Sequence, residues 1–280
     1  MTSSDRRTPA RLADQRALLF DLDGVLTPTA EVHMRAWSRL FTPYLAAHGV
    51  APYTEQDYFA FIDGKPRYDG VRSLLHDRGI DLPEGTPADD PTLDTVCGLG
   101  NRKNAEFTAE LEEHGVAAYP GSVRFLTAAI AAGYEVAVVS SSANAKHVLR
   151  TAGIIDRFDV IVDGAVARAD GLAGKPAPDT YLDAATRFGL TAAECVVVED
   201  ATSGVEAGRN GAFGLVVGVD RGAGADALRE HGADVVVSDL ADLLPDLRGA
   251  GTDVPAADLR GAGTDAPAAD LPPVDPRKTA

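Results

Sequence analysis

The sequence has few of the residues that mark extracellular or membrane proteins. It holds only two cysteines, Cys97 and Cys195, which cannot form a disulfide framework or a four-cysteine zinc site. Its apolar runs fall well short of the roughly 20 residues that a membrane-spanning helix needs. The first 16 residues contain no apolar stretch of the kind found in secretory signals. We therefore expect a cytoplasmic protein with no membrane partner.

Positive charge is also scarce, because 26 lysines and arginines face 42 aspartates and glutamates, for a net charge of -16. Such an excess of carboxylates repels nucleic-acid phosphates, so we expect no nucleic-acid partner. A local basic pocket for a small anion remains compatible with the negative total. Hydrophobic residues make up 45% of the 280 residues, which is enough to bury a full core, and we expect a monomer.

The most informative pattern is an apolar run that ends at two aspartates. Residues 17 to 20 are apolar, and Asp21 and Asp23 follow with one leucine between them. The run is too short for a helix and predicts a buried strand that delivers both carboxylates to the rim of a sheet. Residues two apart in extended chain point to the same side, so these carboxylates repel each other and need a cation or a shared proton. The alternative is a surface turn of the type Asp-x-Asp-Gly.

Strands and helices alternate from about residue 120 onward. Apolar runs predict strands at 135–139, 158–162, 195–198, 213–219 and 233–237, and helical periodicity predicts helices at 123–132, 145–152, 180–188, 204–210 and 226–231. This alternation implies right-handed βαβ units, and therefore an α/β fold with a parallel sheet covered by helices on both faces.

The segment between the first strand and this alternating region has a different pattern. Apolar residues recur at steps of three and four between residues 30 and 47, which predicts an amphipathic helix. Helical patterns continue through 58–115 around a Pro/Gly/Asp-rich loop, and no convincing strand appears. We therefore expect a helical cap at 30–115, inserted in a catalytic core made of residues 16–29 and 116–248.

The two ends of the chain differ again. Residues 1–15 are polar without periodicity, and we expect a flexible leader there. Residues 246–257 are repeated almost unchanged at 258–269, in a Gly/Ala/Pro/Asp-rich composition with too little bulky apolar surface to stack. We expect residues 249–280 to be a disordered repeat tail. A partner-binding tail is the alternative, and only the presence of the segment speaks for it.

Further polar side chains follow the predicted strands or open a helix. Ser140 and the pair Glu199 and Asp200 come at strand ends, and Lys175 lies in a Gly-Lys-Pro loop before a helix. Each alone has an ordinary explanation as a helix cap, a solvated lysine or a charge that complements a helix dipole. Together with Asp21 they describe phosphoryl transfer through an aspartyl phosphate. A Mg²⁺ ion on hard oxygen ligands and a lysine would neutralise the charge that keeps a carboxylate from attacking a phosphate.

These motifs resemble the four motifs of the haloacid dehalogenase superfamily, over residues 17 to about 245. Within it the chain is most similar to the β-phosphoglucomutase group, and the shared stretches are 29–37, 102–104, 119–121 and 174–179. The resemblance implies a Rossmann-like doubly wound parallel sheet core with an inserted α-helical cap domain.

The resemblance also implies roles for the core residues. Asp21 would be the nucleophile, and Asp23 the general acid and base, whose backbone carbonyl also contacts Mg²⁺. Asp21, Glu199 and Asp200 would complete the protein share of the metal shell. Ser140 and Lys175 would hold the transferring phosphoryl group.

Three residues of the expected cap resemble substrate contacts of the group. Arg67 and Lys103 stand at positions of distal phosphate and substrate contacts, and His33 resembles the histidine that links cap closure to Asp23. The alternatives are a surface arginine, a lysine on a helix face and a histidine that packs between helices.

The chain departs from the group at two positions. Pro28 stands where the group usually has Asp, and because proline fixes φ we expect a stiffer hinge between core and cap. Ala143 stands where the mutases commonly carry Lys or Arg, although the phosphate-site Asn144 is retained. The second change removes a cation from the distal phosphate site.

The expected activity is a Mg²⁺-dependent phosphomutase acting on a phosphorylated sugar, β-glucose 1-phosphate to glucose 6-phosphate. The alternative in the same superfamily is a sugar-phosphate phosphatase, in which water takes the phosphoryl group. Dehalogenation is disfavoured, because displacing a halide needs no acid at Asp23. A sugar-phosphate sensor without catalysis is also disfavoured, because a sensor has no use for a nucleophile at Asp21.

Overall fold

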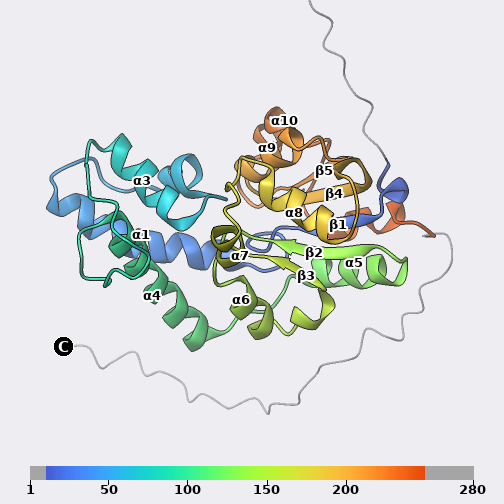
Figure 1. The fold of residues 1–280 in the computed structure, drawn as a ribbon, viewed down its shortest axis with the longest axis horizontal. Helices are drawn as coiled ribbons and strands as arrows, with labels where there is room; N and C mark the ends of the chain where they lie inside the picture. The colour runs from blue at the N-terminus through green and yellow to red at the C-terminus, as the bar shows by residue number, and fades with distance from the viewer. Residues whose placement is uncertain (1–10, 250–280) are drawn as a thin grey trace, which may run out of the picture. The chain divides into compact units, whose positions relative to one another are not determined.

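The structure is a computed structural model, and it describes residues 11–249 (Figure 1). The predicted repeat tail, apart from Gly249, and the first ten residues of the predicted leader lie outside the described residues. Residues 11–15 differ from a flexible leader. They contain a 3₁₀ turn, η1 (Leu12–Asp14), and the side chain of Leu12 is buried in the main apolar cluster. The Tyr134 hydroxyl donates a 3.1 Å hydrogen bond to the Leu12 carbonyl, which fixes this segment.

Six parallel strands form one sheet, and this confirms the predicted fold class. The strands are β1 (Ala17–Phe20), β2 (Glu135–Val139), β3 (Val160–Val162), β4 (Cys195–Glu199), β5 (Leu215–Val219) and β6 (Val235–Val237). Their order is β3-β2-β1-β4-β5-β6, so β1 lies in the middle and pairs with both β2 and β4. The direction of winding reverses at β1, and in doubly wound sheets ligands bind outside the carboxyl ends of the strands at such a point.

Helices cover both faces of the sheet (Figure 1). One face carries α8 (Asp179–Arg187), α9 (Thr202–Asn210) and α10 (Ala225–His231), and the other carries α5 (Pro120–Ala131), α6 (Ala145–Thr151) and the 3₁₀ turn η5 (Leu240–Asp246). A short helix that the sequence does not predict, α7 (Gly164–Ala169), follows β3.

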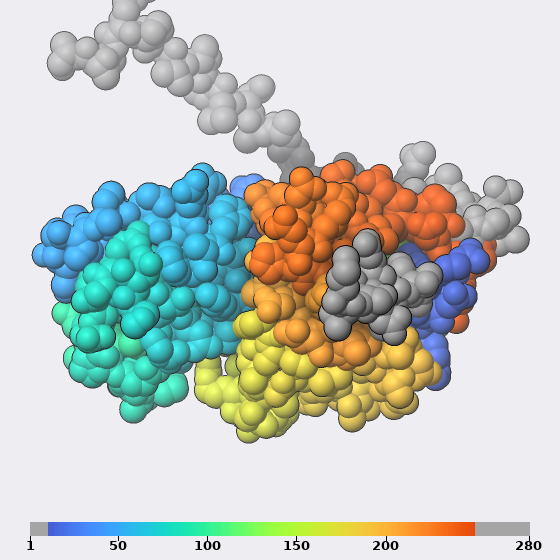
Figure 2. Space-filling view, turned by 90° about the horizontal axis from the view of Figure 1, so that it is seen from above, coloured from blue at the N-terminus to red at the C-terminus, as the bar shows by residue number. Residues whose placement is uncertain are grey.

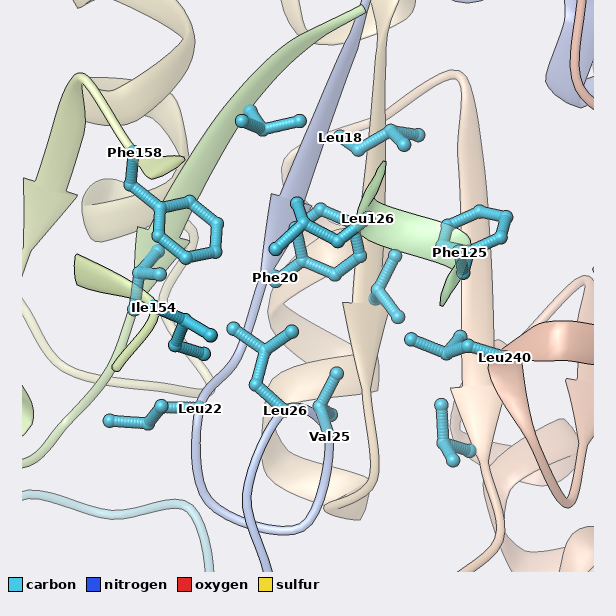
Figure 3. Close-up of a cluster of buried hydrophobic side chains, with 14 of the residues drawn as sticks. Leu18, Phe20, Leu22, Val25, Leu26, Phe125, Leu126, Ile154, Phe158 and Leu240 are labelled. Atoms are coloured by element: carbon cyan, nitrogen blue, oxygen red, sulfur yellow. The ribbon is translucent and has the colours of Figure 1, made fainter. Parts of the chain in front are cut away.

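The strand β1 is buried on both faces, as expected for the centre of a parallel sheet. Leu18 and Phe20 point to one side, where Figure 3 shows them beside Phe125 and Leu126 of α5. The ring of Phe20 lies 6.2 Å from that of Phe125 in an edge-on arrangement. This packing explains why an apolar run of only four residues forms a strand, and it fixes where the following aspartates emerge.

The segment between β1 and α5 is helical, as predicted. It contains α1 (Thr29–Ala47), α2 (Glu55–Asp57), a π-helical turn (Tyr58–Ile62), α3 (Arg67–Asp77) and α4 (Val96–His114). We call residues 29–114 the insertion and the remaining described residues the core. The insertion has an apolar cluster of its own, built around Trp37, Phe41, Leu74 and Leu99.

The two connections between core and insertion lie side by side. The amide of Tyr119 donates a 2.9 Å hydrogen bond to the carbonyl of Leu26, and the Ser122 hydroxyl donates one of 2.7 Å to the carbonyl of Val25. The chain therefore leaves the core and returns to it at one place, directly beyond the end of β1. Among residues 11–249 no helix has the length and hydropathy required to cross a membrane.

Candidate active site

The carboxyl ends of β1, β2 and β4 are joined by one ammonium group. Lys175 Nζ lies 2.5 Å from Asp21 Oδ1 and 2.6 Å from Glu199 Oε1, and it donates a 3.2 Å hydrogen bond to the carbonyl of Val139. Lys175 is buried, with 3% of its surface exposed. Burial alone would lower its pKa, but the charges of Asp21 and Glu199 raise that pKa well above the usual value. These two carboxylates therefore favour the charged form of the lysine.

Three buried carboxylates gather beside this lysine. One ligand atom each from Asp21, Glu199 and Asp200 lies within 4.8 Å of the others. Burial raises the pKa of Asp21 and of Asp200 well above the usual range, and the negative charges of neighbouring carboxylates add to the shift of both. Hard oxygen ligands at this spacing suit a divalent cation, which would favour their ionised forms. The donor set thus fits a divalent metal, and the side chain of Asp23 is outside it.

Gly24 allows Asp200 to approach the aspartate pair. Its φ of +86° lies in the region that favours glycine, and a Cβ atom at this position would lie 1.8 Å from Asp200 Oδ2. The loop after β1 and the loop after β4 can therefore meet only because this residue has no side chain.

The carboxylate of Asp23 turns toward the first turns of the insertion. Thr29, the first residue of α1, donates a hydrogen bond to Asp23 Oδ1, and His33 Nε2 lies 3.5 Å from the same oxygen. Burial would raise the pKa of Asp23, but the contacts with His33 and Thr29 outweigh it and lower that pKa. Asp23 is thus held in its ionised form by residues of the insertion.

His33 and Lys103 form a pair on facing helices of the insertion. Lys103 Nζ contacts His33 Nδ1 and lies 5.1 Å from the centre of the Trp37 ring. Burial lowers the pKa of Lys103 to about 7, and burial together with the charge of Lys103 lowers the pKa of His33. These residues are not surface groups, and they lie next to Asp23.

A cavity of about 520 Å³ separates the core from the insertion. Figure 2 shows a notch where the insertion, blue to blue-green, meets the yellow part of the core. Nine of the ten residues predicted for the site line this cavity: Asp21, Asp23, His33, Arg67, Lys103, Ser140, Asn144, Glu199 and Asp200. The tenth, Lys175, lies beneath its floor against Asp21.

Two predicted residues connect the core side of the cavity to its neighbours. Ser140 is buried, and its hydroxyl oxygen accepts a 3.1 Å hydrogen bond from the amide of Ser142. Asn144 Nδ2 donates a 2.7 Å hydrogen bond to Asn104 Oδ1 of α4, so this asparagine spans the cavity between core and insertion.

Arg168 is a cation of the cavity that the sequence does not reveal. It lies on α7, and its guanidinium carbon is 5.7 Å from the centre of the Tyr68 ring, while that of Arg67 is 5.0 Å from the same ring. The Nε of Arg67 is buried without a hydrogen-bond partner. Neither guanidinium forms an ion pair with any carboxylate of residues 11–249, although the chain is strongly acidic. Two unneutralised cations at one end of a cavity are suited to an anion.

Asp63 is a second residue of the cavity that sequence reasoning misses. It lies in the loop before α3, and burial together with the charge of Glu199 raises its pKa to about 7. The signal is weak, because an aspartate before a glycine in a helical region is typical of an ordinary turn.

The doubly wound sheet, the aspartates at its reversal point and the helical insertion above them define a haloacid dehalogenase-like enzyme. A family model described as a haloacid dehalogenase-like hydrolase matches residues 15–211, and the chain belongs to this family.

Curated relatives carry this likeness over nearly the whole of their own length. The chain is 51% identical over 240 residues to a β-phosphoglucomutase of Mycobacterium bovis, covering 82% of this chain and 91% of the relative. It is 33% identical over 230 residues to hexitol phosphatase A of Escherichia coli, covering 80% of this chain and 91% of the relative. A solved β-phosphoglucomutase of Clostridium difficile shares the fold, with a TM-score of 0.66 at 24% identity over 82% of this chain and 93% of that one.

Proposed function

We propose that this chain is a Mg²⁺-dependent β-phosphoglucomutase, which converts β-glucose 1-phosphate to glucose 6-phosphate through an aspartyl phosphate on Asp21. The observation that carries the proposal is a cavity with positively charged side chains at two separate places, each of a kind that binds phosphate. Asp21 and Lys175 lie at one side, and the unneutralised pair Arg67 and Arg168 lies at another. A mutase needs both, because its intermediate is a sugar that carries two phosphates.

The residues take the following parts in this proposal. Asp21 Oδ attacks phosphorus, the phosphorus–oxygen bond to the sugar breaks, and Asp23 gives the departing oxygen the proton that it took up in the other half of the cycle. In the return step a sugar hydroxyl gives its proton to Asp23 while its oxygen forms the new bond to phosphorus. Lys175 and Ser140 hold the phosphoryl oxygens. Mg²⁺, held by Asp21, Glu199, Asp200 and the Asp23 carbonyl, would supply further positive charge at the phosphoryl group.

Lys103, His33 and Asn144 are assigned to the substrate side of the cavity. Lys103 and His33 contact each other beside Asp23, so a sugar bound there would meet the acid and base at the same time. Asn144 would bind the second phosphate of the substrate, the one away from Asp21. In this structure its side chain is bonded to Asn104 of the insertion.

The deciding experiment is phosphorus NMR of the purified protein with Mg²⁺, β-glucose 1-phosphate and a trace of β-glucose 1,6-bisphosphate. We expect glucose 6-phosphate to appear without an equal amount of inorganic phosphate. Inorganic phosphate as the main product would instead support the second candidate, a sugar-phosphate phosphatase, which the likeness to hexitol phosphatase A favours.

The role of Arg168 can be tested separately. We expect Arg168→Ala to raise the KM for β-glucose 1,6-bisphosphate about tenfold, because a charge-assisted hydrogen bond to phosphate is lost. Hydrolysis of a small phosphate ester should hardly change. Arg150→Ala, on the exposed face of α6 outside the cavity, is the matched control. An equal loss on both substrates would remove Arg168 from the distal site.

We further propose that the metal is Mg²⁺ rather than another divalent ion, that the enzyme is a monomer, and that it works in the cytoplasm. The hard carboxylate donor set supports the first of these. Sedimentation of the full chain would test the second.

A further inference from the structure

A short loop of the insertion is bound to the core by two serine hydroxyls. Ser141 Oγ, from the loop after β2, donates a 2.7 Å hydrogen bond to the carbonyl of Gly64. Ser203 Oγ, in the first turn of α9, donates a 3.1 Å hydrogen bond to the carbonyl of Asp63. Two consecutive carbonyls of the insertion are therefore bound from two different elements of the core.

The contact around these bonds leaves no space for larger side chains. A Cβ atom on Gly64, whose φ is +69°, would lie 2.2 Å from Ser203 Oγ. A Cβ atom on Gly174 would lie 2.4 Å from Cγ of Pro66. The loop 63–66 thus fits against the core at backbone distance, which brings its carbonyls within reach of the two hydroxyls.

Each core residue in this contact is close in sequence to a residue proposed for the chemistry. Ser141 follows Ser140, Gly174 precedes Lys175, and Ser203 comes three residues after Asp200. The hydroxyls of Ser141 and Ser203 both donate their hydrogen bonds to the loop, so they serve the contact between insertion and core.

We propose that Ser141 and Ser203 are positioning residues that hold the insertion against the core while the phosphoryl group is on Asp21, and so favour the sugar over water as its acceptor. This inference rests on the proposed function. In transfer, a sugar hydroxyl oxygen bonds to phosphorus, the bond from phosphorus to the Asp21 oxygen breaks, and the proton goes to Asp23. In hydrolysis, water takes the place of the sugar hydroxyl and inorganic phosphate leaves. A loop held against the core limits the entry of water during this step.

The size of the effect follows from the two hydrogen bonds. One intramolecular hydrogen bond changes an equilibrium about three- to tenfold in net terms. Loss of either hydroxyl should therefore increase the open fraction, and with it the ratio of inorganic phosphate to glucose 6-phosphate, by about that factor. The double variant should multiply the two factors, because the serines lie on different elements.

The experiment measures this product ratio by phosphorus NMR for Ser141→Ala, Ser203→Ala, the double variant and a control. Ser38→Ala is the control, since Ser38 is an exposed serine of α1 whose hydroxyl lies 3.5 Å from that of Thr42, away from the core. We expect an increased ratio in the first three and the wild-type ratio in the control. Ser141→Thr keeps the hydroxyl and should keep the wild-type ratio. A ratio unchanged in the double variant would overturn the inference, even if both rates fall together.

A second readout does not depend on turnover. Trp37 is the only tryptophan of the chain and lines the cavity, so we expect its fluorescence to change when sugar phosphate binds and the insertion closes. With Mg²⁺ present, the glucose 6-phosphate concentration at half-maximal change should rise about three- to tenfold in each alanine variant. The same midpoint as in Ser38→Ala would contradict the inference. If wild type gives neither glucose 6-phosphate nor a phosphoenzyme, the proposed function fails first, whatever the variants do.

Discussion

Asp21→Asn should abolish the phosphoenzyme and lower turnover of β-glucose 1-phosphate by about a thousandfold or more. The amide has nearly the same shape as the carboxylate but is a very poor nucleophile toward phosphorus. Lys175 keeps its ion pair with Glu199 in this variant, so the fold should remain intact. Mass spectrometry of the protein after brief exposure to Mg²⁺ and acetyl phosphate checks the result, because an acyl phosphate adds the mass of one phosphoryl group.

Asp23→Asn is the informative partner for this test. Acetate leaves without the help of an acid, so this variant should still be phosphorylated by acetyl phosphate although it turns over little β-glucose 1-phosphate. If Asp21→Asn forms a phosphoenzyme, Asp21 is not the nucleophile. If the wild type forms one and neither variant does, Asp23 is needed for more than proton transfer. Either result would show that the two aspartates are wrongly assigned.

Lys175→Met should produce the largest loss of stability. Removing the ammonium leaves the carboxylates of Asp21 and Glu199 buried without their cation, and breaking a buried ion pair in this way costs about 3–5 kcal/mol. For a protein of this size the melting temperature should fall by roughly 6–20 °C. Thermal unfolding of wild type and variant without added metal measures the difference.

The pH dependence identifies the cause of this loss. Burial raises the pKa of Asp21 above its value in the unfolded chain, so without Lys175 its destabilising effect grows as pH rises toward the folded-state pKa and fades in acid. The deficit of Lys175→Met should therefore shrink as the pH is lowered toward the pKa of an unfolded carboxyl group. The double variant with Asp21→Asn should recover part of the stability, and saturating Mg²⁺ should do the same. A deficit independent of pH and of Asp21 would mean that the lysine acts only through packing.

The sequence predicts the sheet and the chemical centre well because both depend on local signals. Four apolar residues followed by Asp21, and three valines followed by Glu199 and Asp200, place their carboxylates at strand ends. Parallel pairing of β1 with β4 then brings them together without any further information. The structure brings these predicted residues together, as their chemistry requires. Their catalytic roles are predictions that the variants described above test.

The cationic end of the cavity and the serine contacts cannot be read in the same way. Arg168 lies on a six-residue helix too short for a periodic signal, and it meets Tyr68 only after the insertion packs against the core. The hydrogen bond of Ser141 spans 77 residues and that of Ser203 spans 140, and both end at backbone carbonyls, which every residue possesses. The pattern of side chains in the sequence therefore cannot predict which carbonyl a serine will bind.

The position of the insertion has a consequence for how such enzymes diversify. Because the chain leaves the core after Thr27 and returns at Tyr119, and Tyr119 is bonded to Leu26, a helical segment of another length or sequence can be spliced at this point without disturbing the sheet. The nucleophile and the carboxylate cluster stay with the core, and Arg67, Lys103 and His33 travel with the segment. Exchange of that segment would thus change the residues that face the substrate while the nucleophile and the carboxylate cluster keep their places.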